Sequence, residues 1–151
     1  MLEKEIQEIL SGQREFFLTG KTQDVNFRIE ALKKLKAAII TNEQAIINAL
    51  GNDLRKPLVE SYMSELGMII NEINFAVKNL KKWVKPVKVK STFLVFPAKS
   101  YIMAEPFGIT LIISPWNYPF QLTLGPLVGA IAAGNCCVIK PSEYSKAAES
   151  V

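Results

Sequence analysis

The chain has 151 residues, of which 49% are hydrophobic and 21% are charged, and its formal net charge is +4. These values are typical of one soluble globular domain with a sizeable core. The two cysteines, Cys136 and Cys137, are adjacent and histidine is absent. This composition argues against a disulfide framework and a zinc site of the usual Cys/His type. We therefore expect a cytoplasmic protein without a metal site.

The chain as far as Lys85 carries mainly helical signals. Residues 2–10 mix charged and aliphatic side chains as a short amphipathic helix does. Asp24 stands where it can cap a second helix. The apolar face of this second helix consists of Ile29, Leu32, Leu35 and Ile39.

Two further helices are predicted before residue 86. Thr41, with Gln44 three residues later, has the spacing of a capping box, and Gly51 stands where the following helix would end. Pro57 suits the first turn of a long helix, and Pro86 ends it. The apolar stripe of the long helix, which we interpret as core packing, consists of Leu58, Tyr62, Leu66, Ile69, Ile73, Val77 and Leu80.

A cluster of lysines surrounds the end of the long helix. Such a cluster can mark contact with nucleic acid or with an anionic membrane. It is also typical of a basic helix end followed by a lysine-protected edge strand, and we favour this interpretation. Only Trp83 interrupts the lysines, which leaves no aromatic platform for a single strand, so we expect no nucleic-acid partner. The cluster consists of Lys78, Lys81, Lys82, Lys85, Lys88 and Lys90.

Extended segments begin after Pro86. Residues 87–90 alternate apolar and charged side chains, as a half-exposed strand does, and residues 99–105 form a second extended piece. The segment around Pro97 between them is turn-prone. The two pieces predict a ribbon that leaves the main body.

The remaining residues read as a strand, a helix and a strand. Residues 108–114 have the composition of a buried strand, residues 120–133 suit a helix, and residues 136–140 suit the next strand. We expect a right-handed crossover and a parallel pair. The run from Pro106 to Ile139 has no charged residue and is long enough to cross a bilayer. Prolines divide this run, and a sheet covered on both faces has the same apolarity, so we favour the sheet over a transmembrane segment.

Polar residues follow both predicted strands, where open α/β sheets bind their ligands. Asn117 lies in a proline-containing loop after the first strand, and Lys140, Ser142 and Glu143 follow the second. Lys140 and Glu143 combine a donor with an acceptor, which suits a nucleotide ribose. The glycine-rich dinucleotide signature is absent. The residues alone therefore leave open whether Asn117 is only a turn residue and Lys140 only a solvated strand end.

Four segments closely resemble the aldehyde dehydrogenase family in order and spacing, and the resemblance covers essentially the whole chain. They are residues 105–108 (EPFG), 112–119 (IISPWNYP), 133–135 (AGN) and 140–143 (KPSE). Residues 54–57, 60–61 and 83–86 resemble the class-three-like branch, which oxidises fatty and aromatic aldehydes. The resemblance implies an NAD- or NADP-dependent enzyme that oxidises an aldehyde to a carboxylic acid through a cysteine thiohemiacetal and thioester.

The resemblance also implies residue roles. The amide of Asn117 is expected to help form the oxyanion hole, and Lys140 and Glu143 to contact the adenosine ribose, with Ser142 beside them. The nicotinamide side and ribose wall are expected to be lined by Ile113, Ser114 and Trp116. The family's nucleophilic cysteine and general-base glutamate lie downstream of this chain. Cys136 and Cys137 stand where the family has small or aliphatic residues, so we expect both to be buried.

The expected fold class is α/β, with the chain as the truncated N-terminal part of a longer protein, because two parallel strands do not complete a sheet. Residues 1–85 are the predicted helical part of the cofactor domain, and residues 86–105 resemble the family's oligomerisation arm, which implies a homodimer. Residues 106–151 are the predicted first βαβ unit of a Rossmann-like NAD(P)-binding sheet. One alternative is a non-catalytic remnant or partner subunit that binds a full-length dehydrogenase through its arm. Another is a membrane-associated basic protein.

Overall fold

The computed structural model describes the backbone of residues 2–151 and the side chains of residues 3–151. Three short turns, η1 (Lys21–Gln23), η2 (Tyr62–Leu66) and η3 (Phe93–Val95), accompany the regular elements. The helices are α1 (Leu2–Leu18), α2 (Val25–Thr41), α3 (Glu43–Leu54), α4 (Leu58–Ser61), α5 (Gly67–Trp83), α6 (Gln121–Ala133) and α7 (Lys146–Glu149). The strands are β1 (Val87–Val89), β2 (Ser100–Ile102), β3 (Ile109–Ile113) and β4 (Cys136–Lys140).

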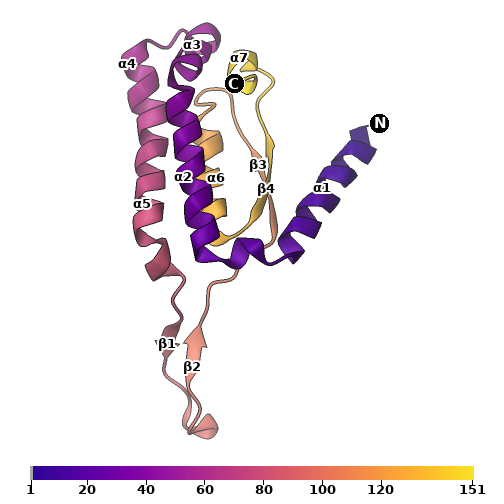
Figure 1. Cartoon of the computed structure of the whole chain (residues 1–151), viewed down its shortest axis with the longest axis vertical. Coiled ribbons are helices and arrows are strands. Elements are labelled where there is room, and N and C mark those ends of the chain that lie inside the picture. Colours follow the sequence, from indigo (N-terminus) through magenta and orange to yellow (C-terminus); the bar gives the residue numbers. More distant parts are fainter. Residues whose placement is uncertain (1) are drawn as a thin grey trace.

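Helix α6 lies at the centre of the molecule, between the β3–β4 sheet on one side and helices α2 and α5 on the other (Figure 1). The core between these helices contains Leu32 from α2, Leu80 from α5 and Val128 from α6, all almost fully buried. Burying one such side chain stabilises a fold by about 1.5–3 kcal/mol. The helical front and the sheet-forming back therefore share one core.

The apolar stripe predicted for the long helix is only partly correct. Leu66, Ile69 and Ile73 are buried, whereas Leu58 and Tyr62 are exposed. The stripe fails at its start because α4 and α5 are joined by a π-helical turn, Tyr62–Leu66, which changes the face that each residue presents.

The helix ends confirm one predicted cap and contradict two other signals. The Asp24 side chain accepts a hydrogen bond of 2.8 Å from the Asn26 N–H and caps α2. The predicted Thr41 capping box is wrong, because α2 continues through Thr41 and α3 begins directly after it. Gly51 lies inside α3, which ends instead at Leu54 and is followed by the C-cap residue Arg55, whose φ of 54° is left-handed.

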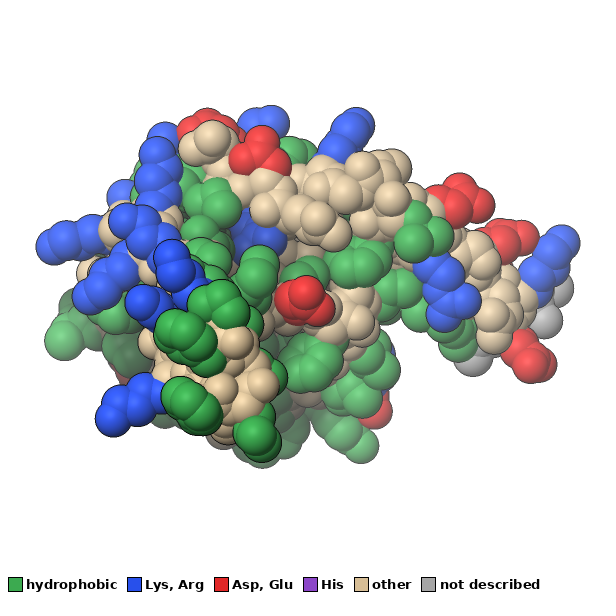
Figure 2. Space-filling model, turned by 90° about the horizontal axis from the view of Figure 1, so that it is seen from below, with side chains coloured by type: hydrophobic (Ala, Val, Ile, Leu, Met, Phe, Trp, Pro, Cys, Tyr) green, Lys and Arg blue, Asp and Glu red, His purple; other side chains and the backbone are tan. Residues whose placement is uncertain are grey.

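Strands β1 and β2 pair antiparallel, from Val87 opposite Ile102 to Val89 opposite Ser100, and form a ribbon that projects beyond α5 (Figure 1). At the tip of this ribbon Phe93 and Leu94 are 91% and 94% exposed. Viewed from the ribbon end, lysine and arginine side chains gather beside exposed hydrophobic side chains (Figure 2).

Strands β3 and β4 pair parallel, with Ile109 opposite Cys136 and Ile113 opposite Lys140, and α6 connects them. The expected α/β fold with N-terminal helices and a parallel βαβ unit is thereby confirmed. Helix α1 lies against the other side of the sheet (Figure 1), and an apolar groove of about 660 Å³ separates them in part. No helix within residues 2–151 is long and apolar enough to span a bilayer.

Gly134 ends α6 in a left-handed conformation, with φ of 90°. The Arg28 guanidinium lies against this turn and donates hydrogen bonds to the carbonyl groups of Thr22, Gln23 and Ala132. A Cβ atom on residue 134 would lie 2.7 Å from the guanidinium. Glycine is therefore required where α6 turns into β4.

Gly134→Ala is expected to lower the free energy of unfolding by about 1–2 kcal/mol or more, because alanine disfavours a left-handed backbone and its Cβ would collide with Arg28. Gly129→Ala is the matched control in the same helix, since nothing lies within 4 Å of its Cβ position. It is expected to stabilise by up to about 1 kcal/mol. Urea denaturation measures the free energy of unfolding of each variant. Equal stabilities of Gly134→Ala and Gly129→Ala would contradict the prediction.

Candidate functional site

The carboxyl ends of β3 and β4 meet at one edge of the sheet. The Ser114 N–H, just past β3, donates a hydrogen bond of 3.1 Å to the carbonyl of Lys140, the last residue of β4. The Ser114 hydroxyl lies 3.4 Å from the same oxygen and is buried. The parallel pairing therefore brings the two segments that the sequence singled out, residues 113–117 and 140–143, to the same edge.

An exposed ion pair follows β4. Lys140 Nζ lies 2.5 Å from Glu143 Oε2, and their side chains are 55% and 66% exposed. The hydrogen bond from Lys140 lowers the pKa of the Glu143 carboxyl group, and a backbone hydrogen bond and the charge of Lys140 act in the same direction. Exposed ion pairs contribute little to stability. Lys140 and Glu143 can therefore separate and bind ligand atoms at a small cost in free energy.

Ser142 lies in the turn between β4 and α7. Its side chain is buried, its hydroxyl accepts a hydrogen bond of 3.3 Å from the Tyr144 N–H, and its carbonyl accepts one from the Ser145 hydroxyl. The carboxylate of Asp53 accepts hydrogen bonds from the N–H groups of Ala147 and Ala148 and so anchors α7 to α3. Ser142 thus orders the turn, and its hydroxyl is not presented on the exposed edge.

A cleft of about 250 Å³ lies between the strand ends, the start of α6 and α7. Its lining is mostly apolar with a few hydroxyl groups, as in many small-molecule sites. Its walls include Ser114, Phe120, Ile139, Pro141, Ser142 and Ser145.

The loop after β3 carries exposed apolar and amide side chains. Ile113 is 69% exposed, and Trp116 and Asn117 are also exposed. The backbone carbonyl of Asn117 accepts a hydrogen bond of 3.0 Å from Lys56 Nζ. Within residues 2–151 the Asn117 side-chain amide has no hydrogen-bond partner, so its two N–H donors face solvent.

Glu65 belongs to this region, although the sequence did not single it out. It lies in the π-helical turn η2 and is 0% exposed. One carboxylate oxygen lies 2.5 Å from Lys56 Nζ, and the other accepts hydrogen bonds from the Phe120 and Gln121 N–H groups at the start of α6. One signal in the sequence could have identified Glu65, namely that its spacing places a carboxylate beside the core-facing stripe of the helix. A buried charge requires partners, so such a residue indicates a polar contact inside the protein.

Cys136 and Cys137 lie at the opposite end of β4. Cys136 is buried and Cys137 is half-buried, and burial raises the pKa of both thiols. The thiols are therefore poor sources of thiolate at neutral pH. Within residues 2–151 no three His, Cys, Asp or Glu side chains gather in a way that could hold a metal ion.

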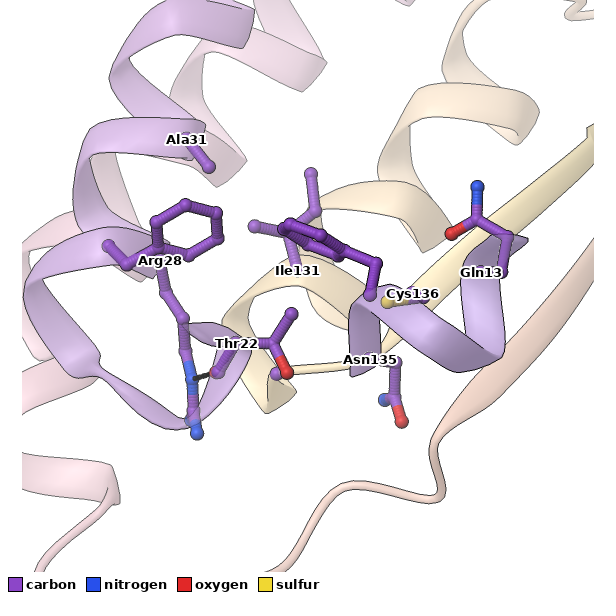
Figure 3. A pocket seen from close by; sticks show the side chains of 10 residues that line it. Gln13, Thr22, Arg28, Ala31, Ile131, Asn135 and Cys136 are labelled. Atoms are coloured by element: carbon purple, nitrogen blue, oxygen red, sulfur yellow. Dashed lines mark hydrogen bonds between the residues drawn. The ribbon is translucent and has the colours of Figure 1, made fainter. Parts of the chain in front are cut away.

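A pocket of about 170 Å³ lies near this amino end of β4, between α1, α2 and α6 (Figure 3). It is lined by Gln13, Thr22, Arg28, Ile131 and Cys136 among others, and Arg28 bonds within the protein to the Thr22 carbonyl. Open α/β sheets bind ligands at the other, carboxyl end of their strands. The edge at residues 113–117 and 140–143 is therefore the candidate functional site.

Comparison with known proteins supports one family throughout. The sequence model described as "Aldehyde dehydrogenase family" matches residues 2–150. The chain is 49% identical over 140 residues to 4,4'-diaponeurosporen-aldehyde dehydrogenase of Staphylococcus aureus, covering 93% of this chain and 30% of that protein. It is 47% identical over 142 residues to aldehyde dehydrogenase family 3 member B1 of Bos taurus, covering 94% and 30%. The expected resemblance to the class-three-like branch is confirmed.

Solved structures agree. A structure described as the substrate-bound state of Staphylococcus aureus AldH superposes with a TM-score of 0.93 at 47% identity, covering 96% of this chain and 32% of that one. A succinic semialdehyde dehydrogenase of Streptococcus pyogenes shares the fold, with a TM-score of 0.82 at 14% identity. The chain spans about 30% of the length of the curated relatives named above.

The burial of the two thiols can be tested by their reactivity. Because burial raises both thiol pKa values, alkylation by iodoacetamide at pH 8 is expected to be several-fold slower in the folded chain than in urea. The folded-state rate is expected to rise only above the ordinary thiol pKa of about 8.5. Mass spectrometry from pH 7 to 10 measures both rates. Rapid modification of either folded cysteine at pH 7 would contradict burial of that thiol.

Proposed function

The chain belongs to the aldehyde dehydrogenase family, and we propose that it forms the N-terminal part of an NAD(P)-dependent enzyme that oxidises an aldehyde to a carboxylic acid. The observation that carries this proposal is the meeting of the Asn117 loop with Lys140 and Glu143 at the carboxyl edge of β3 and β4. A cofactor and an aldehyde react only when held side by side, and this edge offers separate groups for each.

Lys140 and Glu143 are proposed to hold the adenosine ribose of NAD or NADP. Their ammonium and carboxylate groups provide a donor and an acceptor 2.5 Å apart on an exposed surface, which suits two neighbouring hydroxyl groups. Lys140 also tolerates a 2′-phosphate, whereas Glu143 repels one, so both cofactors stay within the proposal. When bound, the cofactor supplies the hydride acceptor.

The cofactor's remaining surface is proposed to rest on the walls of the same edge. Exposed side chains of Ile113 and Trp116 offer apolar contact for a ring. Ser114 and Ser142 are both buried, so their contribution is to shape the backbone turns that bound the cleft. In this proposal the exposed residues Ile113 and Trp116 contact the cofactor, and the buried residues Ser114 and Ser142 support the backbone of the site.

Asn117 is proposed to stabilise the oxyanion. Attack of a nucleophile on an aldehyde moves negative charge onto the carbonyl oxygen, and a neutral amide held near that oxygen stabilises the charge without reorganising. The amide of Asn117 is exposed and has unused donors, while its backbone is held by Lys56. The nucleophilic cysteine and the general base are proposed to come from residues outside this chain, because Cys136 and Cys137 have raised thiol pKa values.

The β1–β2 ribbon is proposed to be the contact of a homodimer. Its tip exposes Phe93, Leu94 and Phe96 almost completely, and exposed apolar surface of this kind marks association sites. The lysines around it favour solubility when the tip is uncovered. A cytoplasmic location is proposed as well, which the free state of both cysteines supports.

In the dehydrogenase that contains this chain, Asn117→Ala is expected to lower kcat by about 10²–10³-fold, the usual effect of one lost oxyanion donor. Asn117→Asp is expected to be at least as damaging at neutral pH, because a carboxylate repels the oxyanion. Cofactor affinity, measured by fluorescence, is expected to change little. The control is Asn52→Ala, an exposed amide of α3. Turnover by Asn117→Ala within a few-fold of the parent enzyme would make Asn117 a turn residue only.

Lys140→Ala is expected to raise the KM for the cofactor by about tenfold and to leave kcat nearly unchanged, because a ribose contact acts equally before and during the reaction. Lys33→Ala is the matched control, since Lys33 forms an exposed ion pair with Glu30 at a distance of 2.8 Å far from the site. Steady-state kinetics with varied cofactor separates the two parameters. A large loss of kcat at unchanged cofactor KM would remove Lys140 from the ribose.

A further inference from the structure

A buried ion pair joins three segments around the Asn117 loop. Lys56, which follows α3, is 8% exposed at its side chain, and Glu65 in η2 is 0% exposed. We propose that Lys56 and Glu65 are positioning residues, which hold the loop so that the Asn117 amide meets the oxyanion. This proposal rests on the proposed role of Asn117 and adds residues that do not touch the reacting atoms.

Glu65 holds the end of the loop through the start of α6. The first N–H groups of a helix have no partner within the helix, and their partial positive charge favours an anion. Phe120, at the N-cap of α6, has no polar side-chain atom, and Glu65 Oε2 accepts hydrogen bonds of 2.9 and 3.3 Å from the N–H groups of Phe120 and Gln121. A carboxylate from a different helix thus fixes the residue at which the loop becomes α6.

Lys56 holds the middle of the loop. Its Nζ atom donates to the Asn117 carbonyl at 3.0 Å and lies 3.8 Å above the centre of the Tyr118 ring. The Glu65 carboxylate, 2.5 Å away, fixes the ammonium group between these two contacts. If Lys56 contacted only the Tyr118 ring, the Asn117 carbonyl would be free to move, and if it contacted only the carbonyl, the ring would be free to move.

The loop is therefore attached at three points within seven residues. Ser114 bonds to the Lys140 carbonyl at one end, Asn117 bonds to Lys56 in the middle, and Phe120 bonds to Glu65 at the other end. The Asn117 side chain is left free while its backbone is fixed. An amide that must meet an oxyanion without reorganising needs this combination, because a misplacement of about 1 Å can cost about 10²-fold in rate.

The π-helical turn explains how Glu65 reaches both partners. The Gly67 N–H donates to the Tyr62 carbonyl, five residues earlier, and a Cβ on residue 67 would lie 3.1 Å from that oxygen. Such turns within α-helices frequently lie at functional sites. The wider turn and Gly67 are local departures from a regular helix. Glu65 is the buried charged residue within this turn.

The test is a double-mutant cycle in the dehydrogenase that contains this chain. Glu65→Gln keeps the shape but replaces one acceptor oxygen by an NH2 group, so either Lys56 or the start of α6 loses its partner. It is expected to lower kcat by about 10–10²-fold and to leave the cofactor Kd unchanged. In the Asn117→Ala background the same change is expected to have almost no further effect on kcat, because the amide that it positions is gone.

A purely structural role of Glu65 predicts a different result, in which Glu65→Gln lowers kcat by the same factor in both backgrounds. Arg28→Lys is the control, because Arg28 is also buried and binds the other end of α6. It is expected to lower the melting temperature and to leave kcat within about twofold. If Glu65→Gln does not fold, Lys56→Met, which leaves Glu65 its α6 partners, enters the same cycle.

Each outcome decides between the proposals. Equal loss in both backgrounds, or an unchanged kcat for Glu65→Gln when Asn117→Ala is slow, overturns the positioning role and leaves the role of Asn117 intact. An unchanged kcat for Asn117→Ala overturns the oxyanion role itself, and with it the positioning role. A loss that appears only when Asn117 is present supports both.

Discussion

The carboxylate of Glu65 joins the helical front of the molecule to its sheet-forming back. A carboxylate with no exposed surface is stable only when its lost hydration is replaced, and here an ammonium group and two backbone N–H groups replace it. Glu65 and these partners belong to three segments, so none of the segments can shift without leaving a buried charge unpaired. Removing one member of such a pair typically costs about 3–5 kcal/mol. The position of the start of α6 depends on this contact.

An exposed ion pair lies at the end of β4 and a buried one holds the loop after β3, and the proposed roles follow from that difference. Lys140 and Glu143 are both more than half exposed at their side chains, so their pairing is weak and they can turn toward a ligand. Lys56 and Glu65 are buried, so their geometry is rigid. A cofactor that binds and leaves suits the first arrangement. An amide that must stabilise a transition state without moving suits the second.

The sequence predicted the elements whose boundaries are set by local chemistry. Prolines, Gly134 and the apolar composition located β3, α6 and β4, and the Asp24 carboxylate located the start of α2. The helix boundaries predicted at Thr41 and Gly51 were wrong. Capping boxes and glycine helix ends are local preferences, which the packing of α2 and α3 on the core overrides. Glu65 was not singled out, and Lys56 was noted only as part of the family resemblance of residues 54–57. Their contacts are with Asn117 and Phe120, more than fifty residues away, and one sequence carries no record of such contacts.

The cysteines show why a site can hold the electrostatics of a reaction without its nucleophile. Attack on an aldehyde requires a thiolate, and a thiolate requires nearby positive charge or exposure. Burial raises the pKa of the Cys136 and Cys137 thiols, and both residues lie at the end of β4 that is remote from Lys140. In its proposed role, Asn117 stabilises an oxyanion only after a nucleophile has created it. The proposed chemistry therefore requires a thiolate that approaches the exposed face of the Asn117 loop, where Ile113 and Trp116 are also uncovered.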